Sequence, residues 1–213
     1  MSMEIKDPRG FLKALLAMNI RSYVSGKAGA TTLGFLAERV AACVRCDLSR
    51  TRLNVVFGEG SQRAELLFVG EAPGEEEDLQ GRPFVGRAGR LLDELIERIG
   101  LSRKDVYICN VLKCRPPNNR DPEPQEAESC RSFLESQIEI IRPRVICTLG
   151  RHAYNTLLGK DERITRIRGV LTEYKGIKVL PTYHPSFLLR NQSAMKDAHE
   201  DMEKVKALLH RAD

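Results

Sequence analysis

Short apolar runs and amphipathic segments alternate along most of the chain. Four runs rich in aliphatic and β-branched residues read as strands buried on both faces, at residues 65–70, 105–112, 144–150 and 177–184. Helical spacing of apolar residues predicts helices over 31–46, 86–100, 123–141 and 151–159, with a closing helix from about Ser193. This alternation predicts an α/β protein, a three-layer α/β/α sandwich with a central four-stranded, mainly parallel sheet.

The N-terminal segment differs in texture from the rest of the chain. Residues 11–24 predict a separate helix, and the stretch SGKAGATT is typical of a linker. We therefore expect two parts, a helical extension with its linker at residues 1–35 and a folded domain at residues 36–213. Packing on the surface of the domain is the usual role of such a helix, and binding of a partner is the alternative.

Charge and hydropathy narrow the class of protein. The net charge of +5 is compatible with a polyanionic partner, and equally with simple solubility. The sequence has no apolar run of membrane-spanning length and no secretory signal pattern, so we expect a cytoplasmic protein with no membrane partner.

The six cysteines fall into two groups. Cys109 and Cys147 lie in apolar runs, as buried thiols usually do. The other four lie among polar residues and prolines: a C-x-x-C pair at a predicted helix end, Cys43 and Cys46, and a distant pair, Cys114 and Cys130. Four thiolates suit a structural zinc ion or a [4Fe–4S] cluster, and the spacing does not separate the two. Four unrelated cysteines, or a redox-active C-x-x-C, are weaker alternatives.

Ligands of parallel sheets bind beyond the carboxyl ends of the strands, where this chain has unusual loops. Glu71 directly follows a strand in GEAPGEEED, so its carboxylate would project into the cleft. Its acidic neighbours at 75–78 are explained more simply as charges at a helix start. Phe84, held in the loop GRPFVG, either covers the core or forms a stacking platform for a flat ligand.

Two further strand-end residues carry hydrogen-bonding side chains. Asn110 has an amide that can read the edge of a nucleobase, although an asparagine there is often a turn former. His184 begins the loop HPSFLLR, whose leucine pair could enter a base stack and whose Arg190 could hold a phosphate.

The motifs GEAPGEEEDLQGRPFVGRAG, NVLKCRPPNNRDP and HPSFLLR, with the four cysteines in this order, resemble the family 4 uracil-DNA glycosylases. These are the iron–sulfur members of the uracil-DNA glycosylase superfamily, and the resemblance covers roughly residues 36–210. It implies a DNA repair enzyme that flips uracil out of single- or double-stranded DNA and hydrolyses the N-glycosidic bond with water, leaving an abasic site. We expect the enzyme to be a monomer.

The resemblance also implies a role for each motif residue. Two would be catalytic: Glu71, which orients water, and His184, which faces O2 of the base. The uracil-binding residues would be Gly70, Ala72, Phe84 and Asn110. The DNA-binding residues would be Ser186, Leu188, Leu189, Arg190, Arg115 and Arg120. The cluster ligands would be Cys43, Cys46, Cys114 and Cys130, so that [4Fe–4S] is favoured over zinc.

The chain departs from the related family 1 enzymes at two positions. Those enzymes carry an aspartate where this chain has Ala72, so water activation would fall to Glu71, with Glu77 in reserve. They carry a blocking tyrosine where this chain has Gly74, so the resemblance names no residue that excludes thymine.

Two rival functions remain. A superfamily variant that bonds covalently to abasic DNA uses a histidine in a basic insertion, but residues 115–130 contain no histidine and no Lys-Arg run. A non-catalytic iron–sulfur DNA-binding module is the second rival. It is disfavoured because the candidate catalytic and uracil-binding side chains occur together.

Overall fold

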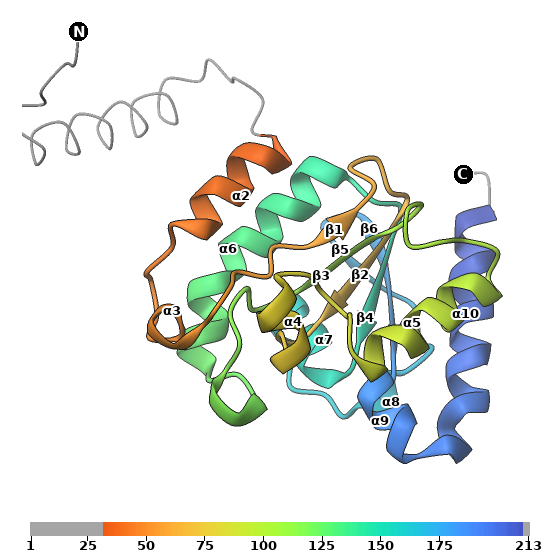
Figure 1. The fold of residues 1–213 in the computed structure, drawn as a ribbon. Helices are drawn as coiled ribbons and strands as arrows, with labels where there is room; N and C mark the ends of the chain where they lie inside the picture. The colour runs from red at the N-terminus through yellow and green to blue at the C-terminus, as the bar shows by residue number, and fades with distance from the viewer. Residues whose placement is uncertain (1–31, 211–213) are drawn as a thin grey trace, which may run out of the picture. The chain divides into compact units, whose positions relative to one another are not determined.

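The computed structural model describes residues 32–210, and its centre is a six-stranded sheet in the order β1-β3-β2-β4-β6-β5 (Figure 1). The strands are β1 (Glu59–Gly60), β2 (Leu66–Gly70), β3 (Tyr107–Asn110), β4 (Val145–Leu149), β5 (Thr172–Tyr174) and β6 (Ile177–Thr182). The four inner strands run parallel, and β1 and β5 are antiparallel to their neighbours at the two edges.

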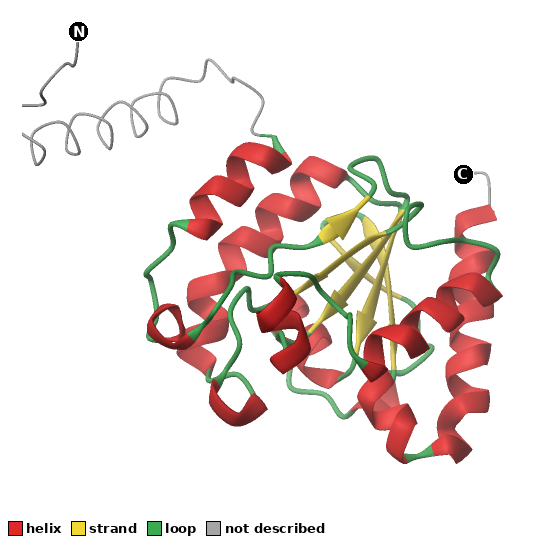
Figure 2. Ribbon diagram, viewed as in Figure 1, coloured by secondary structure: helices red, strands yellow, loops and turns green. Residues whose placement is uncertain are grey.

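Helices lie on both sides of this sheet (Figure 2). They are α2 (Leu33–Ala41), α3 (Leu48–Thr51), α4 (Glu75–Gln80), α5 (Arg87–Arg98), α6 (Pro124–Ile141), α7 (Arg151–Leu158), α8 (Ile164–Ile167), α9 (Pro185–Arg190) and α10 (Met195–His210). Two 3-10 helices, η1 (Pro117–Asn119) and η2 (Gln192–Ala194), precede α6 and α10.

The inner strands are buried on both faces because successive side chains point to opposite sides of the sheet. In β2, Leu67 and Val69 pack into a core with α2, α6 and α7. The alternating residues Leu66 and Phe68 pack with α5 and α10 on the other face. Two apolar cores on either side of one sheet confirm the predicted three-layer α/β/α architecture with a mainly parallel sheet.

The sheet has two more strands than the four that were predicted. The extra strands β1 and β5 contain only two and three residues, too few for a recognisable alternation. A second difference is α9, a short helix where an exposed loop was expected after His184.

The described part of the chain begins just before α2. Leu33 and Leu36 of this helix are buried in the core, so the folded unit includes residues ahead of the boundary placed between 35 and 36. The predicted N-terminal helix and linker lie outside the described residues. Within residues 32–210, no helix is long and apolar enough to cross a membrane.

The parallel strands end side by side, and this brings the predicted site residues together. Gly70 at the end of β2 is paired with Asn110 at the end of β3. On the other side, Leu149 at the end of β4 is paired with Thr182 at the end of β6. The loops that carry Glu71, Asn110 and His184 therefore open on the same edge of the sheet.

Candidate active site

A cleft of about 670 Å³ lies at the carboxyl edge of the sheet. Of the predicted site residues, it is lined by Glu71, Ala72, Glu77, Phe84, Asn110, Arg120, His184, Ser186 and Arg190. Loops distant in the sequence thus supply one cavity, as the strand order requires.

Gly70 lies against the two residues predicted to hold a base. A Cβ atom on Gly70 would come within 2.3 Å of Asn110 Oδ1 and 2.5 Å of Phe84 Cζ. No side chain fits there without moving one of them. The glycine therefore permits the Phe84 ring and the Asn110 amide to meet at the end of β2.

Asn110 presents an unpaired acceptor at this point. Its side chain is only 1% exposed, and Oδ1 is one of two buried side-chain polar atoms without a hydrogen-bond partner among the described residues. A buried acceptor without a donor costs about 1–3 kcal/mol. A ligand that brings an N–H group into the cleft would recover that energy.

Phe84 has a left-handed backbone conformation, with φ of 52°, which is uncommon for an aromatic residue. Its loop is held from two sides. Arg103 donates a hydrogen bond of 3.1 Å to the Phe84 carbonyl oxygen and another to the carbonyl oxygen of Pro83. Gly89 of α5 lies so close that a Cβ there would meet the Phe84 carbonyl. The ring is thereby fixed, with its centroid 5.7 Å from that of His184.

Glu77 fastens the Phe84 loop to the loop that follows β2. Its Oε2 accepts a hydrogen bond from the backbone N–H of Gly74 at 3.1 Å. Its Oε1 accepts from the N–H groups of Val85 and Gly86, at 2.9 and 3.1 Å. With both oxygens engaged by the backbone, the carboxylate favours a role in holding the loop over the reserve role in water activation that the sequence suggested.

His184 is a neutral hydrogen-bond donor. Burial, aided by the charge of Arg190, lowers the pKa of its imidazole to about 4. Its Nδ1 accepts a hydrogen bond from the backbone N–H of Ser186 at 3.1 Å and lies 2.7 Å from the Ser186 hydroxyl. Because Nδ1 is an acceptor in the neutral ring, the proton is on Nε2. Ser186 thus positions His184, a contact that the sequence did not indicate.

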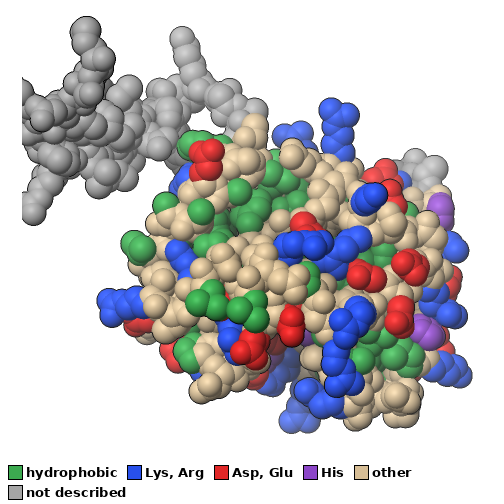
Figure 3. All heavy atoms as spheres, in the orientation of Figure 1, with side chains coloured by type: hydrophobic (Ala, Val, Ile, Leu, Met, Phe, Trp, Pro, Cys, Tyr) green, Lys and Arg blue, Asp and Glu red, His purple; other side chains and the backbone are tan. Residues whose placement is uncertain are grey.

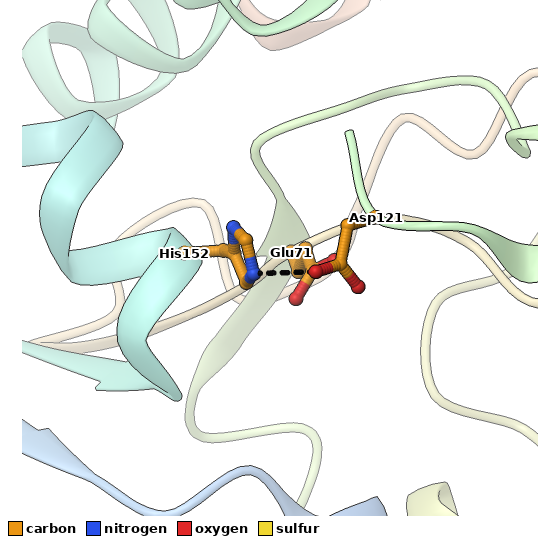
Figure 4. A group of neighbouring side chains, drawn as sticks. All are labelled: Glu71, Asp121 and His152. Atoms are coloured by element: carbon orange, nitrogen blue, oxygen red, sulfur yellow. Dashed lines mark ion pairs between the residues drawn. The ribbon is translucent and has the colours of Figure 1, made fainter. Parts of the chain in front are cut away.

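Glu71 is half-buried beside two residues that the sequence reasoning missed, Asp121 and His152 (Figure 4). The ligand atoms of all three lie within 4.8 Å of one another, close enough to share a cation. His152 Nε2 is 3.1 Å from Asp121 Oδ2, and an Arg151 nitrogen is 3.5 Å from the same oxygen. Burial and the charge of Asp121 raise the pKa of Glu71, while the charges of His152 and Arg151 lower it in part.

The signal for this group was present in the sequence. His152 and Arg151 occupy LGRHA, directly after a predicted strand, and Asp121 ends the segment NNRD. Only the loops' placement at one edge of the sheet brings them to Glu71. Tyr183 and Phe187, whose rings stack with centroids 4.8 Å apart, also line the cleft and were not predicted.

The predicted DNA-contacting leucines take different positions. Leu188 is fully buried in the core that contains α5 and α10. It therefore does not lie at the surface, where it was expected to contact DNA. The cause is α9, whose helical turn directs one leucine inward. Leu189 is half-buried against the same core, and Phe187 of the same helix reaches the cleft instead.

The predicted arginines also differ in their surroundings. Arg190 is exposed at the cleft and forms no ion pair within residues 32–210. Arg120 makes a two-pronged contact with Glu126, at 2.9 and 2.6 Å, and so anchors its loop to α6. Arg115 lies outside the cleft lining and bonds Asn119 at 2.8 Å. Basic side chains also gather over α9 and the start of α5 (Figure 3).

The four candidate metal ligands line one small cavity, from the end of α2 to α6, together with Lys113 and Arg52. Arg52 donates a hydrogen bond of 3.1 Å to Cys114 Sγ. Burial raises the pKa of Cys114 and of Cys130, and the nearby Cys46 thiol adds to both shifts. The other two cysteines, Cys109 and Cys147, are fully buried in the two cores, as predicted.

The chain was compared with known proteins. The family model of the uracil DNA glycosylase superfamily matches residues 57–207. A type-4 uracil-DNA glycosylase of Thermotoga maritima is 52% identical over 83% of this chain and 94% of that protein. Type-4 enzymes of Saccharolobus solfataricus and Archaeoglobus fulgidus are 50% and 46% identical, over 86% and 92% of their lengths. The chain belongs to the type-4 group of the uracil-DNA glycosylase superfamily.

The superfamily match contains every predicted residue of the cleft. Cys114 and Cys130 lie within it as well, but Cys43 and Cys46 precede it. The C-x-x-C half of the cysteine site is therefore outside the part of the chain that matches the superfamily as a whole.

Proposed function

We propose that the protein removes uracil from DNA by hydrolysing its N-glycosidic bond and leaves an abasic site. The observation that carries the proposal is the buried, unpaired Oδ1 of Asn110 next to the fixed ring of Phe84. A flat base with an N–H group on its edge would donate a hydrogen bond to Oδ1 and stack on the ring. The names of the close relatives support the same reaction.

Base selection follows from the amide of Asn110. Uracil has an N3–H group that can donate a hydrogen bond to Oδ1, whereas N3 of cytosine is itself an acceptor and would leave Oδ1 unpaired. A mismatch of this kind in a buried site discriminates strongly between ligands. Stacking on Phe84 would fix the plane of the base. We assign Gly70 and Ala72 to the same binding site, as backbone that lies close to the base.

The reaction needs the base outside the duplex, because the C1′–N1 bond is not accessible in the stack. As that bond breaks, negative charge develops on uracil, and the Nε2–H of neutral His184 would stabilise it. Fixed donors of this kind contribute on the order of a hundredfold in rate. Glu71, in its ionised form, would orient the attacking water and offset positive charge on the sugar.

DNA binding would use the surface around α9. Arg190 is exposed beside the cleft and would contact a phosphate. Phe187 and Leu189, rather than Leu188, would fill the space that the flipped nucleotide leaves. Arg115 and Arg120 would act chiefly by holding the loop after Asn110, since both are bound by neighbouring side chains.

The four cysteines Cys43, Cys46, Cys114 and Cys130 would hold a [4Fe–4S] cluster, with zinc as the alternative. Their common cavity, and the hydrogen bond from Arg52 to a sulfur, fit a metal–thiolate centre. When bound, the group would supply a structural tie between the end of α2, the loop after Asn110 and α6. Iron and sulfide content with visible absorption would support the cluster, and stoichiometric zinc without absorption would exclude it.

The decisive experiment uses a duplex and a single strand that each contain one uracil, followed by alkaline cleavage at abasic sites. Cleavage at the uracil position, and none with cytosine or thymine in its place, is the expected result. DNA binding without cleavage would favour a non-catalytic module, and a stable protein–DNA adduct would favour the covalent variant. We also propose that the enzyme acts as a monomer in the cytoplasm, and that the residues ahead of Leu33 form an extension to the domain.

A further inference from the structure

The surroundings of Glu71 contain opposite charges from two different elements. His152 and Arg151 belong to α7, which follows β4, and Asp121 lies in the loop between η1 and α6. These three side chains are the charged groups that act on Glu71 most directly. Glu77 from α4, His184 directly before α9 and Arg190 at the end of α9 line the same cleft.

We propose that His152 and Asp121 are positioning residues for Glu71, and that their opposite charges, held together at the cleft wall, tune the carboxylate for its role in the reaction. The inference rests on the proposed function. A carboxylate oxygen of Glu71, one of Asp121 and a ring nitrogen of His152 lie within 4.8 Å of one another, so the three side chains interact. The orientation of water was assigned to Glu71 alone, which leaves the other two side chains without a role.

The two neighbours have opposite effects on the carboxylate. Burial raises the pKa of Glu71, so that protonation begins at a higher pH than for an exposed glutamate. The charge of Asp121 raises this pKa further, and the charge of His152 lowers it. A protonated Glu71 would neither orient water as an acceptor nor offset the sugar cation. The balance between His152 and Asp121 would therefore decide at which pH activity falls.

The contact between the neighbours explains how they act as a pair. His152 Nε2 lies 3.1 Å from Asp121 Oδ2, so the exposed aspartate holds the imidazole at the cleft. An Arg151 nitrogen lies 3.5 Å from the same oxygen, so two residues of α7 contact Asp121. His152 thus acts through Glu71 and needs no contact with the substrate.

The test compares pH profiles of single-turnover uracil excision for His152→Gln and Asp121→Asn. Glutamine keeps a hydrogen-bonding side chain but cannot become charged, so the acid limb should move to higher pH. Loss of the Asp121 charge should move the acid limb to lower pH. In both variants the rates should approach that of the wild type at high pH, and the affinity for uracil-containing DNA should be unchanged.

Matched controls change the same residue types away from the cleft. His199 lies on α10 and Asp161 is exposed in the loop after α7, so His199→Gln and Asp161→Asn should leave the profile unaltered. The charge of His152 also lowers the pKa of His184. The comparison is therefore repeated in a His184→Gln background, where the two variants should still shift the acid limb in opposite directions.

Two results would overturn the inference. If both variants keep the wild-type profile, His152 and Asp121 do not act on Glu71. If His152→Gln instead weakens DNA binding and changes its salt dependence, the histidine contacts a phosphate. An inactive wild-type protein would refute the proposed function itself, so the two failures can be told apart.

Discussion

The ammonium group of Lys113 donates a hydrogen bond of 2.6 Å to the backbone carbonyl oxygen of Asn110. Lys113 is only 1% exposed, and it donates a second bond of 2.6 Å to Oε1 of Gln137 on α6. Its neighbour in the chain is Cys114, and its backbone N–H interacts with the Cys130 thiol. One buried lysine therefore connects the end of β3, where Asn110 would hydrogen-bond the base, with the cysteine site.

Lys113→Met should weaken uracil excision, although Lys113 does not line the cleft. The change leaves the Asn110 carbonyl and Gln137 Oε1 without their donor, at a cost of about 1–3 kcal/mol for each buried acceptor. Loss of the fixed Asn110 position should raise KM for uracil-containing DNA. Steady-state kinetics and urea unfolding check both effects, with the exposed Lys104→Met as control. Wild-type KM in a folded Lys113→Met variant would show that the contact does not position Asn110.

Asn110→Ala should separate activity from stability. Since Oδ1 has no partner in the free protein, its removal breaks no hydrogen bond there, and the free energy of unfolding should change by less than about 1 kcal/mol. Uracil excision should fall by about a hundredfold or more, because the base loses its specific acceptor. Oligonucleotide cleavage and urea unfolding measure the two quantities. Large destabilisation with residual activity in proportion to the folded fraction would contradict the assignment.

Glu77→Gln should impair the site by releasing the loop of Phe84. An amide replaces one of the two oxygens that accept hydrogen bonds from Gly74, Val85 and Gly86, so at least one backbone donor loses its partner. We expect a loss of about 1–3 kcal/mol in stability and a lower single-turnover rate at all pH values. The exposed neighbour Glu76→Gln is the control. A change in the pH profile, with stability intact, would instead restore Glu77 as the residue that activates water.

His184 should make the protein less stable in mild acid. Its pKa of about 4 in the folded state lies below the usual value near 6.5, so the unfolded chain binds more protons between these limits. Stability contributed by the neutral ring is present above the unfolded pKa and declines as pH falls toward the folded pKa. Between pH 7 and 5.5 the loss is on the order of 1 kcal/mol.

Urea unfolding of the wild type and His184→Gln at several pH values isolates this contribution. The variant should show a flatter dependence on pH, because glutamine does not titrate. Identical slopes would mean that His184 takes up its proton at the same pH in the folded and unfolded chains, so that burial does not keep the ring neutral in mild acid.

The layer order and the inner strands could be predicted from hydropathy, because buried strands and amphipathic helices leave periodic patterns over several turns or pleats. The edge strands β1 and β5 could not, since two or three residues carry no period. Phe84 and Asn110 were identified from motifs, but the contacts that fix them come from elsewhere. Arg103 and Gly89 hold Phe84, and their own sequence surroundings give no sign of it.

By itself, the sequence determined which residue types follow each strand and which four cysteines have polar neighbours along the chain. It thereby determined the kind of chemistry that the loops can perform. Only the tertiary structure decided which loops meet, because the strand order β3-β2-β4-β6 sets the neighbours of Glu71. It brought His152 and Asp121 to Glu71, and it buried Leu188. Such outcomes depend on contacts between residues far apart in the chain, and local patterns do not encode them.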